Sequence, residues 1–360
     1  MSLFDISEDE IDLREKFKNK IIANRIPINA TVFLTNNCNF QCKHCYVQSQ
    51  KNKNKLPLRI GEWEKLLREL KHNGCIYLTI SGGEALSALD FLEFYNMAYD
   101  LNFQIRIISN LSLLNEKHKR LFGSKKPNSI IVSLYGFSDK TYSEFCDVQG
   151  VFNKIIYNIK TLYEMGLNVE LQTVVNTMNY NEISLMNDFA NKNHIKMSFY
   201  RNITCEIDGN ARPLNYQISI SQELESYKIL CDEDELKQAI RTNNRMWDNG
   251  YKRCFAGLTN CYIDYQGNMF LCNHMQDIKV SLLEEGFGQC WESMYQLRKK
   301  YIEKSNPCSN CKKRALCGKC TPAFENLKKS FKFPFPECHA NDELIKNLNL
   351  ELDNNERCKV

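Results

Sequence analysis

The sequence has no long apolar run and only a small excess of charge of either sign. No stretch approaches the roughly 20 apolar residues that a membrane-spanning helix needs. The N-terminal MSLFDISEDEIDLREKF has neither the basic flank nor the apolar core of a secretory signal. The 47 basic and 43 acidic residues leave a formal charge of +4, too small for wrapping nucleic acid or docking on an anionic membrane. These absences favour a cytoplasmic protein with no nucleic-acid partner and no membrane partner.

The sequence also has no internal repeat and no low-complexity tract. With 43% hydrophobic and 25% charged residues among 360, it can bury a large core, and we expect one large domain and a smaller one. It contains 17 cysteines. In a reducing compartment a disulfide framework does not explain them, because such frameworks belong to small secreted chains. Metal or cluster ligation is the better interpretation.

Between about residues 30 and 201, short β-rich runs alternate with amphipathic stretches. Leucines at helical spacing precede the second run, and Ile155, Ile159 and Leu162 precede the fifth. Gly166 stands where a helix ending near Glu164 would stop. This rhythm predicts an α/β fold with parallel strands and crossover helices. The predicted strands are Ala30–Leu34, Cys75–Ile80, Gln104–Ile108, Ser129–Leu134, Val169–Val175 and Lys196–Arg201.

After Arg201 the rhythm breaks, a helix is predicted around Gln222–Arg241, and cysteines become dense between residues 254 and 338. This change of composition marks the domain boundary. We therefore predict an N-terminal extension (1–29), a barrel domain (30–235), a connector (236–253), a cysteine-rich domain (254–340) and a tail (341–360). The basic, Asn-rich segment Lys51–Lys55 is interpreted as a solvated loop.

A cysteine loop follows the first predicted strand. The segment TNNCNFQCKHCYV places Cys38, Cys42 and Cys45 at C-x3-C-x2-C spacing, so three thiolates can converge on one cofactor. A structural zinc site normally has four closed ligands, and no fourth ligand follows at the usual short spacing. An iron-sulfur cluster held by three cysteines leaves one iron free for another ligand. A zinc site or unreactive cysteines remain the alternative.

This loop resembles the defining motif of the radical S-adenosylmethionine (radical SAM) superfamily, whose fold is a partial (β/α)6 TIM-like barrel. The resemblance covers roughly residues 30 to 201. It implies that a catalytic 4Fe-4S cluster on the three cysteines and S-adenosylmethionine together produce a 5'-deoxyadenosyl radical, which removes hydrogen from an unactivated carbon. A flavodoxin- or ferredoxin-type reductant is implied as the electron source.

The same resemblance assigns cofactor contacts. The second predicted strand ends in SGGEAL, where the family's Gly-Gly-Glu holds the methionine amine, and a carboxylate is a suitable partner for an ammonium. At the position of a family arginine that grips the cofactor carboxylate, this chain has Phe145, so that partner is unassigned. The implied cofactor-binding residues are His44, Gly82, Gly83, Glu84, Ser109, Asn110, Ser133 and Met197.

The C-terminal cysteines resemble the SPASM domain of peptide-modifying radical enzymes, with a last spacing one residue short. The resemblance implies two auxiliary 4Fe-4S clusters with four protein ligands each, which then carry electrons rather than bind substrate. A zinc-ribbon partition of the same cysteines is the alternative. The implied ligands are Cys254, Cys261, Cys272 and Cys320 for the first cluster, and Cys308, Cys311, Cys317 and Cys338 for the second.

Relatives with both domains act on peptides, so the resemblance implies a radical SAM oxidoreductase that closes a thioether or C–C cross-link in a small ribosomal precursor peptide. Formylglycine formation ranks second, because sulfatase maturases carry an aspartate where Asn273 stands and asparagine cannot act as a base. Non-oxidative changes such as epimerisation, and a non-enzymatic electron carrier or zinc scaffold, are further alternatives. With only about 29 residues before the first strand, leader recognition is expected from a separate leader-binding protein, from the barrel mouth, or not at all.

Overall fold

The computed structural model describes residues 8–50, 56–232, 234–236, 238, 254–303, 311, 313, 320–332, 334, 338, 342–343 and 345–346. One nine-stranded sheet organises these residues, in the order β6-β5-β4-β3-β2-β1-β7-β8-β9. Its first six strands in sequence run parallel to their neighbours. They are β1 (Asn29–Phe33), β2 (Tyr77–Ser81), β3 (Gln104–Ser109), β4 (Ser129–Ser133), β5 (Val169–Val174) and β6 (Lys196–Tyr200).

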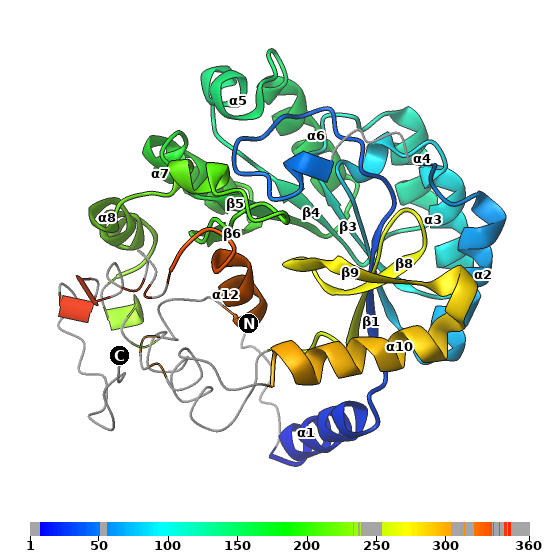
Figure 1. Ribbon diagram of the computed structural model, residues 1–360. Helices are drawn as coiled ribbons and strands as arrows, with labels where there is room; N and C mark the ends of the chain where they lie inside the picture. Colours follow the sequence, from blue (N-terminus) through cyan, green and yellow to red (C-terminus); the bar gives the residue numbers. More distant parts are fainter. Residues whose placement is uncertain are drawn as a thin grey trace.

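Helices cover the outer face of this curved sheet, and its inner face surrounds the candidate site (Figure 1). The α2 residues Trp63, Leu66 and Leu70 are all buried, as their helical spacing predicts. The α/β fold with a mainly parallel sheet is therefore confirmed. The covering helices are α2 (Ile60–His72), α3 (Phe91–Asp100), α4 (Glu116–Ser124), α5 (Asp139–Cys146), α6 (Phe152–Glu164) and α7 (Ile183–Lys192).

Helix α8 (Ile220–Leu230) is shorter than the predicted Gln222–Arg241. The chain turns to an extended conformation at Cys231. The Asp232 carboxylate then accepts a hydrogen bond from the Glu235 amide at 2.7 Å. This is the geometry of a new helix N-cap, so an aspartate that favours capping interrupts the helix. Residues 239–253 of the predicted connector and the Lys51–Lys55 loop lie outside the described residues.

Three strands that were not predicted extend the sheet beyond the expected domain boundary. Strand β7 (Asn260–Ile263) pairs in parallel with β1, and β8 (Asn268–Cys272) and β9 (Met275–Ser281) follow antiparallel. Helix α10 (Leu282–Tyr301) packs on this extension. The first cysteines of the C-terminal segment are thus built directly onto the barrel sheet, beside the strand that precedes the cysteine loop.

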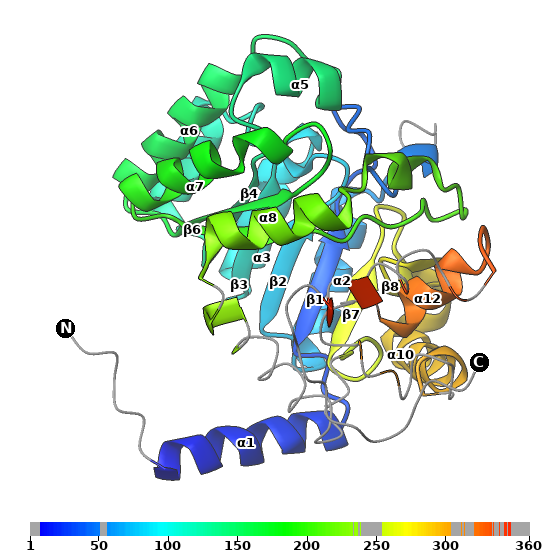
Figure 2. The same cartoon turned by 90° about the vertical axis from the view of Figure 1, so that its left-hand side faces the viewer.

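Two further helices complete the described chain. Helix α1 (Glu8–Ala23) lies apart from the barrel helices, while α12 (Thr321–Leu327) lies against α10 (Figure 2). The α1 end is tied to α10, because Trp291 Nε1 donates to the Arg25 carbonyl at 2.8 Å. Among the described residues no helix is both long and apolar enough to cross a membrane.

Candidate active site

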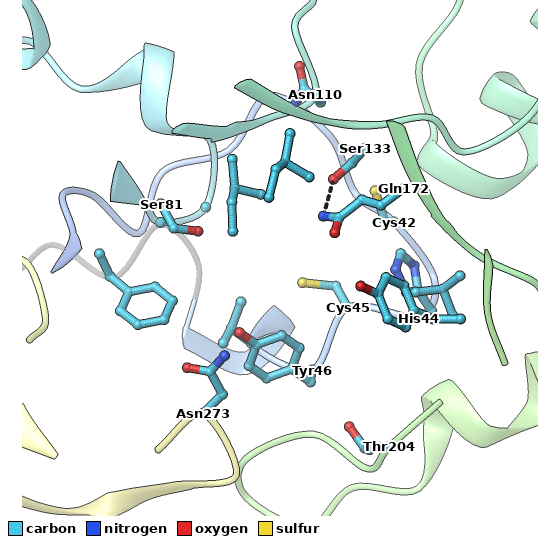
Figure 3. Close-up of a pocket in the computed structure, with 18 of the residues that line it drawn as sticks. Cys42, His44, Cys45, Tyr46, Ser81, Asn110, Ser133, Gln172, Thr204 and Asn273 are labelled. Atoms are coloured by element: carbon cyan, nitrogen blue, oxygen red, sulfur yellow. Dashed lines mark hydrogen bonds between the residues drawn. The ribbon is translucent and has the colours of Figure 1, made fainter. Parts of the chain in front are cut away.

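A pocket of about 650 Å³ lies inside the curved sheet (Figure 3). Ten of the residues expected to bind the cluster or its cofactor line it, while Met197 does not. Met197 packs against the core from β6, whereas Tyr200 and the segment 201–204 that follows β6 form that part of the wall. The ten residues are Cys38, Cys42, His44, Cys45, Gly82, Gly83, Glu84, Ser109, Asn110 and Ser133.

Backbone hydrogen bonds fix the cysteine loop. The Gln41 amide donates to the Cys146 carbonyl at 2.8 Å, and the Lys43 amide donates to the Phe145 carbonyl at 3.0 Å. Both acceptors lie at the end of α5. Phe40 is almost fully buried between these anchors and the barrel core. The loop is therefore held on both sides of Cys42, so its three thiols face the pocket from a fixed backbone.

The two glycines of the SGGEAL turn pack against the same loop. The amides of Gly83 and Glu84 donate to the carbonyls of Thr35 and Asn37, each at 2.8 Å. A Cβ at Gly82 would lie 2.4 Å from the Thr35 oxygen, and a Cβ at Gly83 would lie 2.4 Å from the Asn37 oxygen. Glycine is thus required because two backbones approach closely, and this contact sets Glu84 beside the cysteine loop.

Glu84 is 2% exposed, and its carboxylate accepts three short hydrogen bonds. Oε1 accepts from the Ser109 hydroxyl at 2.7 Å and from the Leu86 amide at 3.0 Å, and Oε2 accepts from the Asn110 amide at 2.7 Å. Burial raises the pKa of Glu84, and these hydrogen bonds oppose the shift. A cation beside the carboxylate would favour its ionised form further. Ser109 and Asn110, predicted as cofactor contacts, thus also orient Glu84.

Phe145 stands at the position where the family carries an arginine, and here it has a structural role. Its ring stacks on His44 with centroids 4.9 Å apart and planes 21° apart. This stack and the hydrogen bond from the Lys43 amide to the Phe145 carbonyl hold Lys43 and His44, the two residues between Cys42 and Cys45, in place. The pocket wall elsewhere carries Arg106 on β3 and Arg201 after β6, two cations that were not predicted. Arg201 already donates to Ser226 Oγ at 2.8 Å.

Ser133 ends β4 and accepts a hydrogen bond from Gln172 Nε2 at 3.3 Å, as the dashed line in Figure 3 shows. Gln172, on β5, was not predicted as a site residue. No local motif marks it. Its place in the wall follows only from the pairing of Ser133 with Gln172 across the two strands.

A second group of cysteines lies in the extension, and one of them, Cys320, lines the same pocket. Burial raises the pKa of Cys272 to about 12, and the nearby Cys320 and Cys254 thiols contribute to that shift. Cys320 itself lines the pocket, as do Asn273 and His274. The structure does not bring Cys261 to this set, and its thiol instead donates to the Asn29 carbonyl at 3.7 Å.

The predicted second auxiliary set is only partly described. Cys311 and Cys338 are described, and Cys308 and Cys317 lie outside the described residues. Within the part of the chain that the structure describes, no three His, Cys, Asp or Glu side chains are grouped closely enough to hold one metal ion. The cysteines outside the predicted ligand sets include Cys75, Cys146 and Cys290, which are buried in the core.

Comparison with known proteins identifies the barrel. The model of the Radical SAM superfamily matches residues 32–189, which contain the cysteine loop and the SGGEAL turn. The chain contains a radical SAM domain. It is a radical SAM enzyme, and the family predicted from the cysteine loop is confirmed.

Individual proteins and structures match different shares of the chain. An AdoMet-dependent heme synthase of Methanosarcina barkeri is 20% identical over 312 residues, 80% of this chain and 89% of the relative. The sporulation killing factor maturation protein SkfB of Bacillus subtilis is 28% identical over 159 residues, 44% of this chain and 38% of SkfB. The crystal structure of Streptococcus suis SuiB bound to precursor peptide SuiA matches with a TM-score of 0.63 and 18% identity, over 90% of this chain and 78% of SuiB. This last likeness supports the fold of the extension as well as that of the barrel.

Proposed function

We propose that this radical SAM enzyme modifies a ribosomally made peptide and closes an oxidative cross-link in it, a thioether or a C–C bond. The observation that carries the proposal is that one pocket is lined by the cysteine loop on one side and by Tyr262, Asn273, His274 and Cys320 of the extension on the other. A substrate bound between them contacts the cysteine loop and Cys320. The similarity to SkfB, a maturation protein, and the fold shared with SuiB, which binds a precursor peptide, favour a peptide as that substrate.

The residues present fit the cofactors of this family. Cys38, Cys42 and Cys45 converge on the pocket, and the Glu84 carboxylate is held in place for an ammonium group. Cys272 and Cys320 lie near each other on the opposite side. When bound, S-adenosylmethionine and the iron-sulfur clusters supply a 5'-deoxyadenosyl radical and an electron acceptor. The protein's own part is to orient the cofactor through Glu84 and to hold the substrate inside the barrel.

The balance of the reaction predicts the product. One hydrogen atom leaves the substrate carbon, and closing the cross-link releases a second proton and one electron. Each event therefore makes the peptide lighter by two hydrogens and yields one 5'-deoxyadenosine.

Heme synthesis is a second candidate, because the heme synthase of Methanosarcina barkeri aligns over 89% of its length. The two candidates differ in substrate and in product. A heme synthase acts on a tetrapyrrole and leaves peptides unchanged.

The test is co-expression of this chain with short peptides encoded next to its gene, under anaerobic conditions. Mass spectrometry should show a loss of about 2 Da per cross-link, with equimolar 5'-deoxyadenosine. A Cys45→Ala variant serves as the inactive control. An unchanged peptide mass with altered stereochemistry would replace cross-linking by epimerisation, and heme formed from an added tetrapyrrole precursor would favour the second candidate.

A further inference from the structure

The inner face of the barrel carries one row of polar side chains that crosses five neighbouring strands. Each residue of this row pairs with the next across the sheet, and all except the last line the pocket. The row combines hydroxyl groups with a single guanidinium, and it is called the polar row below. Its members are Tyr262 of β7, Thr31 of β1, Thr79 of β2, Arg106 of β3 and Ser129 of β4.

An apolar row separates the polar row from the end of the pocket proposed for the cofactor. It lies two residues further along the same strands, which is about 7 Å. Arg106 itself lies three residues before Ser109, the partner of the Glu84 carboxylate, or about 10 Å along β3. The polar row is therefore set deeper in the barrel than the cofactor contacts. The apolar side chains that line the pocket between them are Phe33, Ile108 and Ile131.

The strand pattern and one hydrogen bond fix the direction of Arg106. Ile105 and Ile107, its neighbours along β3, are buried in the core, so Arg106 faces the interior of the barrel. Its Nε donates to Ser129 Oγ at 3.2 Å. This bond leaves the two terminal Nη groups for another partner, and such a planar fork matches the two oxygens of a carboxylate.

The charge of Arg106 is not neutralised by any of the described residues. Apart from histidines, the charged side chains that line the pocket are Glu84, Arg106 and Arg201. Glu84 is held at the strand ends by its three hydrogen bonds. The Arg201 guanidinium points to α8, where Nε donates to Ser226 and the central carbon lies 3.8 Å from the centroid of the Tyr227 ring. Within the described chain, Arg106 forms no ion pair.

A substrate that fills the pocket removes water from Arg106. A guanidinium that loses its water without gaining an anion or enough acceptors is costly to bury, and the apolar row beside it supplies none. A neutral substrate would therefore bind poorly against this wall. A substrate whose carboxylate meets the Nη groups would replace the lost water with charge-assisted hydrogen bonds.

We propose that Arg106 and the polar row form a carboxylate subsite for the substrate peptide, which takes an Asp or Glu side chain or the C-terminal carboxylate. The inference rests on the proposed function, and it adds the chemical class of a group that the peptide must carry. The apolar row accommodates the methylene groups that connect this carboxylate to the reacting part of the peptide. Arg106 thus determines specificity and takes no part in the chemical step.

The first test measures binding alone, on the reconstituted enzyme with S-adenosylmethionine and without reductant. Titration calorimetry compares the N-methylamide of N-acetylglutamate with that of N-acetylglutamine, and N-acetylalanine with its amide. In at least one pair the acid should bind about tenfold more tightly, and that pair identifies the source of the carboxylate. Arg106→Gln should remove the preference. Arg120→Gln, on the exposed side of α4, removes the same charge and should keep it.

Equal affinities of acids and amides for the wild type, or no saturable binding of any probe, would overturn the subsite. An equal loss of S-adenosylmethionine affinity in Arg106→Gln would also overturn it, because Arg106 would then hold the cofactor carboxylate. Arg106→Lys decides the case where Arg106→Gln does not fold, since it keeps the cation and loses the fork. An undiminished preference in Arg106→Lys would count against the proposal.

The second test uses the peptide found by co-expression. Its Asp and Glu residues are replaced by their amides one at a time, and its C-terminus is amidated. One of these changes should raise KM about tenfold for the wild type and leave KM unchanged for Arg106→Gln. A modified peptide whose KM depends on none of its carboxylates would overturn the subsite and leave the proposed function in place. If no peptide is modified while the probes still show a preference that depends on Arg106, peptide maturation fails and the carboxylate subsite stands.

Discussion

The two cysteine sets of this molecule are organised by different means. Cys38, Cys42 and Cys45 lie on one loop, and backbone hydrogen bonds to the end of α5 hold that loop. Cys254 and Cys320 are far from Cys272 in sequence and lie near it only because a strand, a loop and a short helix come together there. Local spacing alone predicts the first set. The second depends on which face of the sheet each residue occupies.

The two regions also differ in the contacts that keep them folded. The cysteine loop rests on the parallel barrel, with Phe40 buried and Gly82 and Gly83 packed on its backbone. The first cysteine of the extension depends on one buried side chain, since Arg298 donates to the carbonyls of Cys254 and Ala256 at 2.8 and 2.9 Å. We therefore expect the barrel site to remain folded without its cluster, and the extension to depend more on ligation.

The largest expected effect is the loss of the first set. Replacing Cys38, Cys42 and Cys45 with Ala should abolish cleavage of S-adenosylmethionine and remove about four irons per chain, because that cluster has no other protein ligand. The far-ultraviolet circular dichroism should stay unchanged. Cys231→Ala, at the end of α8 and outside both predicted ligand sets, is the control and should retain full activity. Cleavage of the cofactor by the triple variant would show that the radical is formed elsewhere.

A smaller effect is expected at Glu84, the proposed partner of the cofactor ammonium. Glu84→Gln keeps the shape but removes the charge, and a charged hydrogen bond contributes about 1.5–3 kcal/mol, so S-adenosylmethionine should bind roughly 10- to 150-fold more weakly. Because burial raises the pKa of Glu84, the wild-type carboxyl takes up a proton at a higher pH than an exposed glutamate does. Affinity should therefore fall as the pH drops through that raised pKa.

Titration calorimetry at several pH values separates these effects. The Glu84→Gln variant should bind the cofactor with little dependence on acidification, since the titrating group is gone. Glu93→Gln, on the exposed side of α3, is the matched control. Equal affinities for wild type and Glu84→Gln would place the ammonium elsewhere in the pocket.

How much of this was predictable from the sequence differs between the two regions. All six barrel strands lie within two residues of their predicted bounds, because each is a short apolar run followed by a helix with a clear apolar face. Strand β7 was missed, since it has only four residues and pairs with β1 across more than two hundred residues. The roles of Ser109 and Asn110 beside Glu84 depend on the pairing of β2 with β3, which no local motif contains.

Cys261 illustrates the limit most clearly. By spacing alone it is an acceptable ligand, seven residues after Cys254 and eleven before Cys272. The face of the sheet that it occupies differs from that of Tyr262 by strand parity, and parity is fixed only when the register with β1 is known.

The smallest effect is expected in the extension, at Arg298. The guanidinium is 1% exposed, and it contacts Cys254 and Ala256 through Nη1 and Glu303 through Nε at 3.1 Å. Arg298→Lys keeps the charge but lacks the planar fork that reaches all three groups, so about one net hydrogen bond is lost, about 1 kcal/mol. Release of auxiliary iron to a chelator in the triple cysteine variant should then become about fivefold faster.

Lys299→Arg, on the exposed face of α10, is the matched control and should release iron at the parent rate. S-adenosylmethionine affinity, measured with the catalytic cysteines intact, should not change, because no Arg298 atom lines the pocket. A change in that affinity as large as the change in iron release would mean that the two regions are coupled and not independently held.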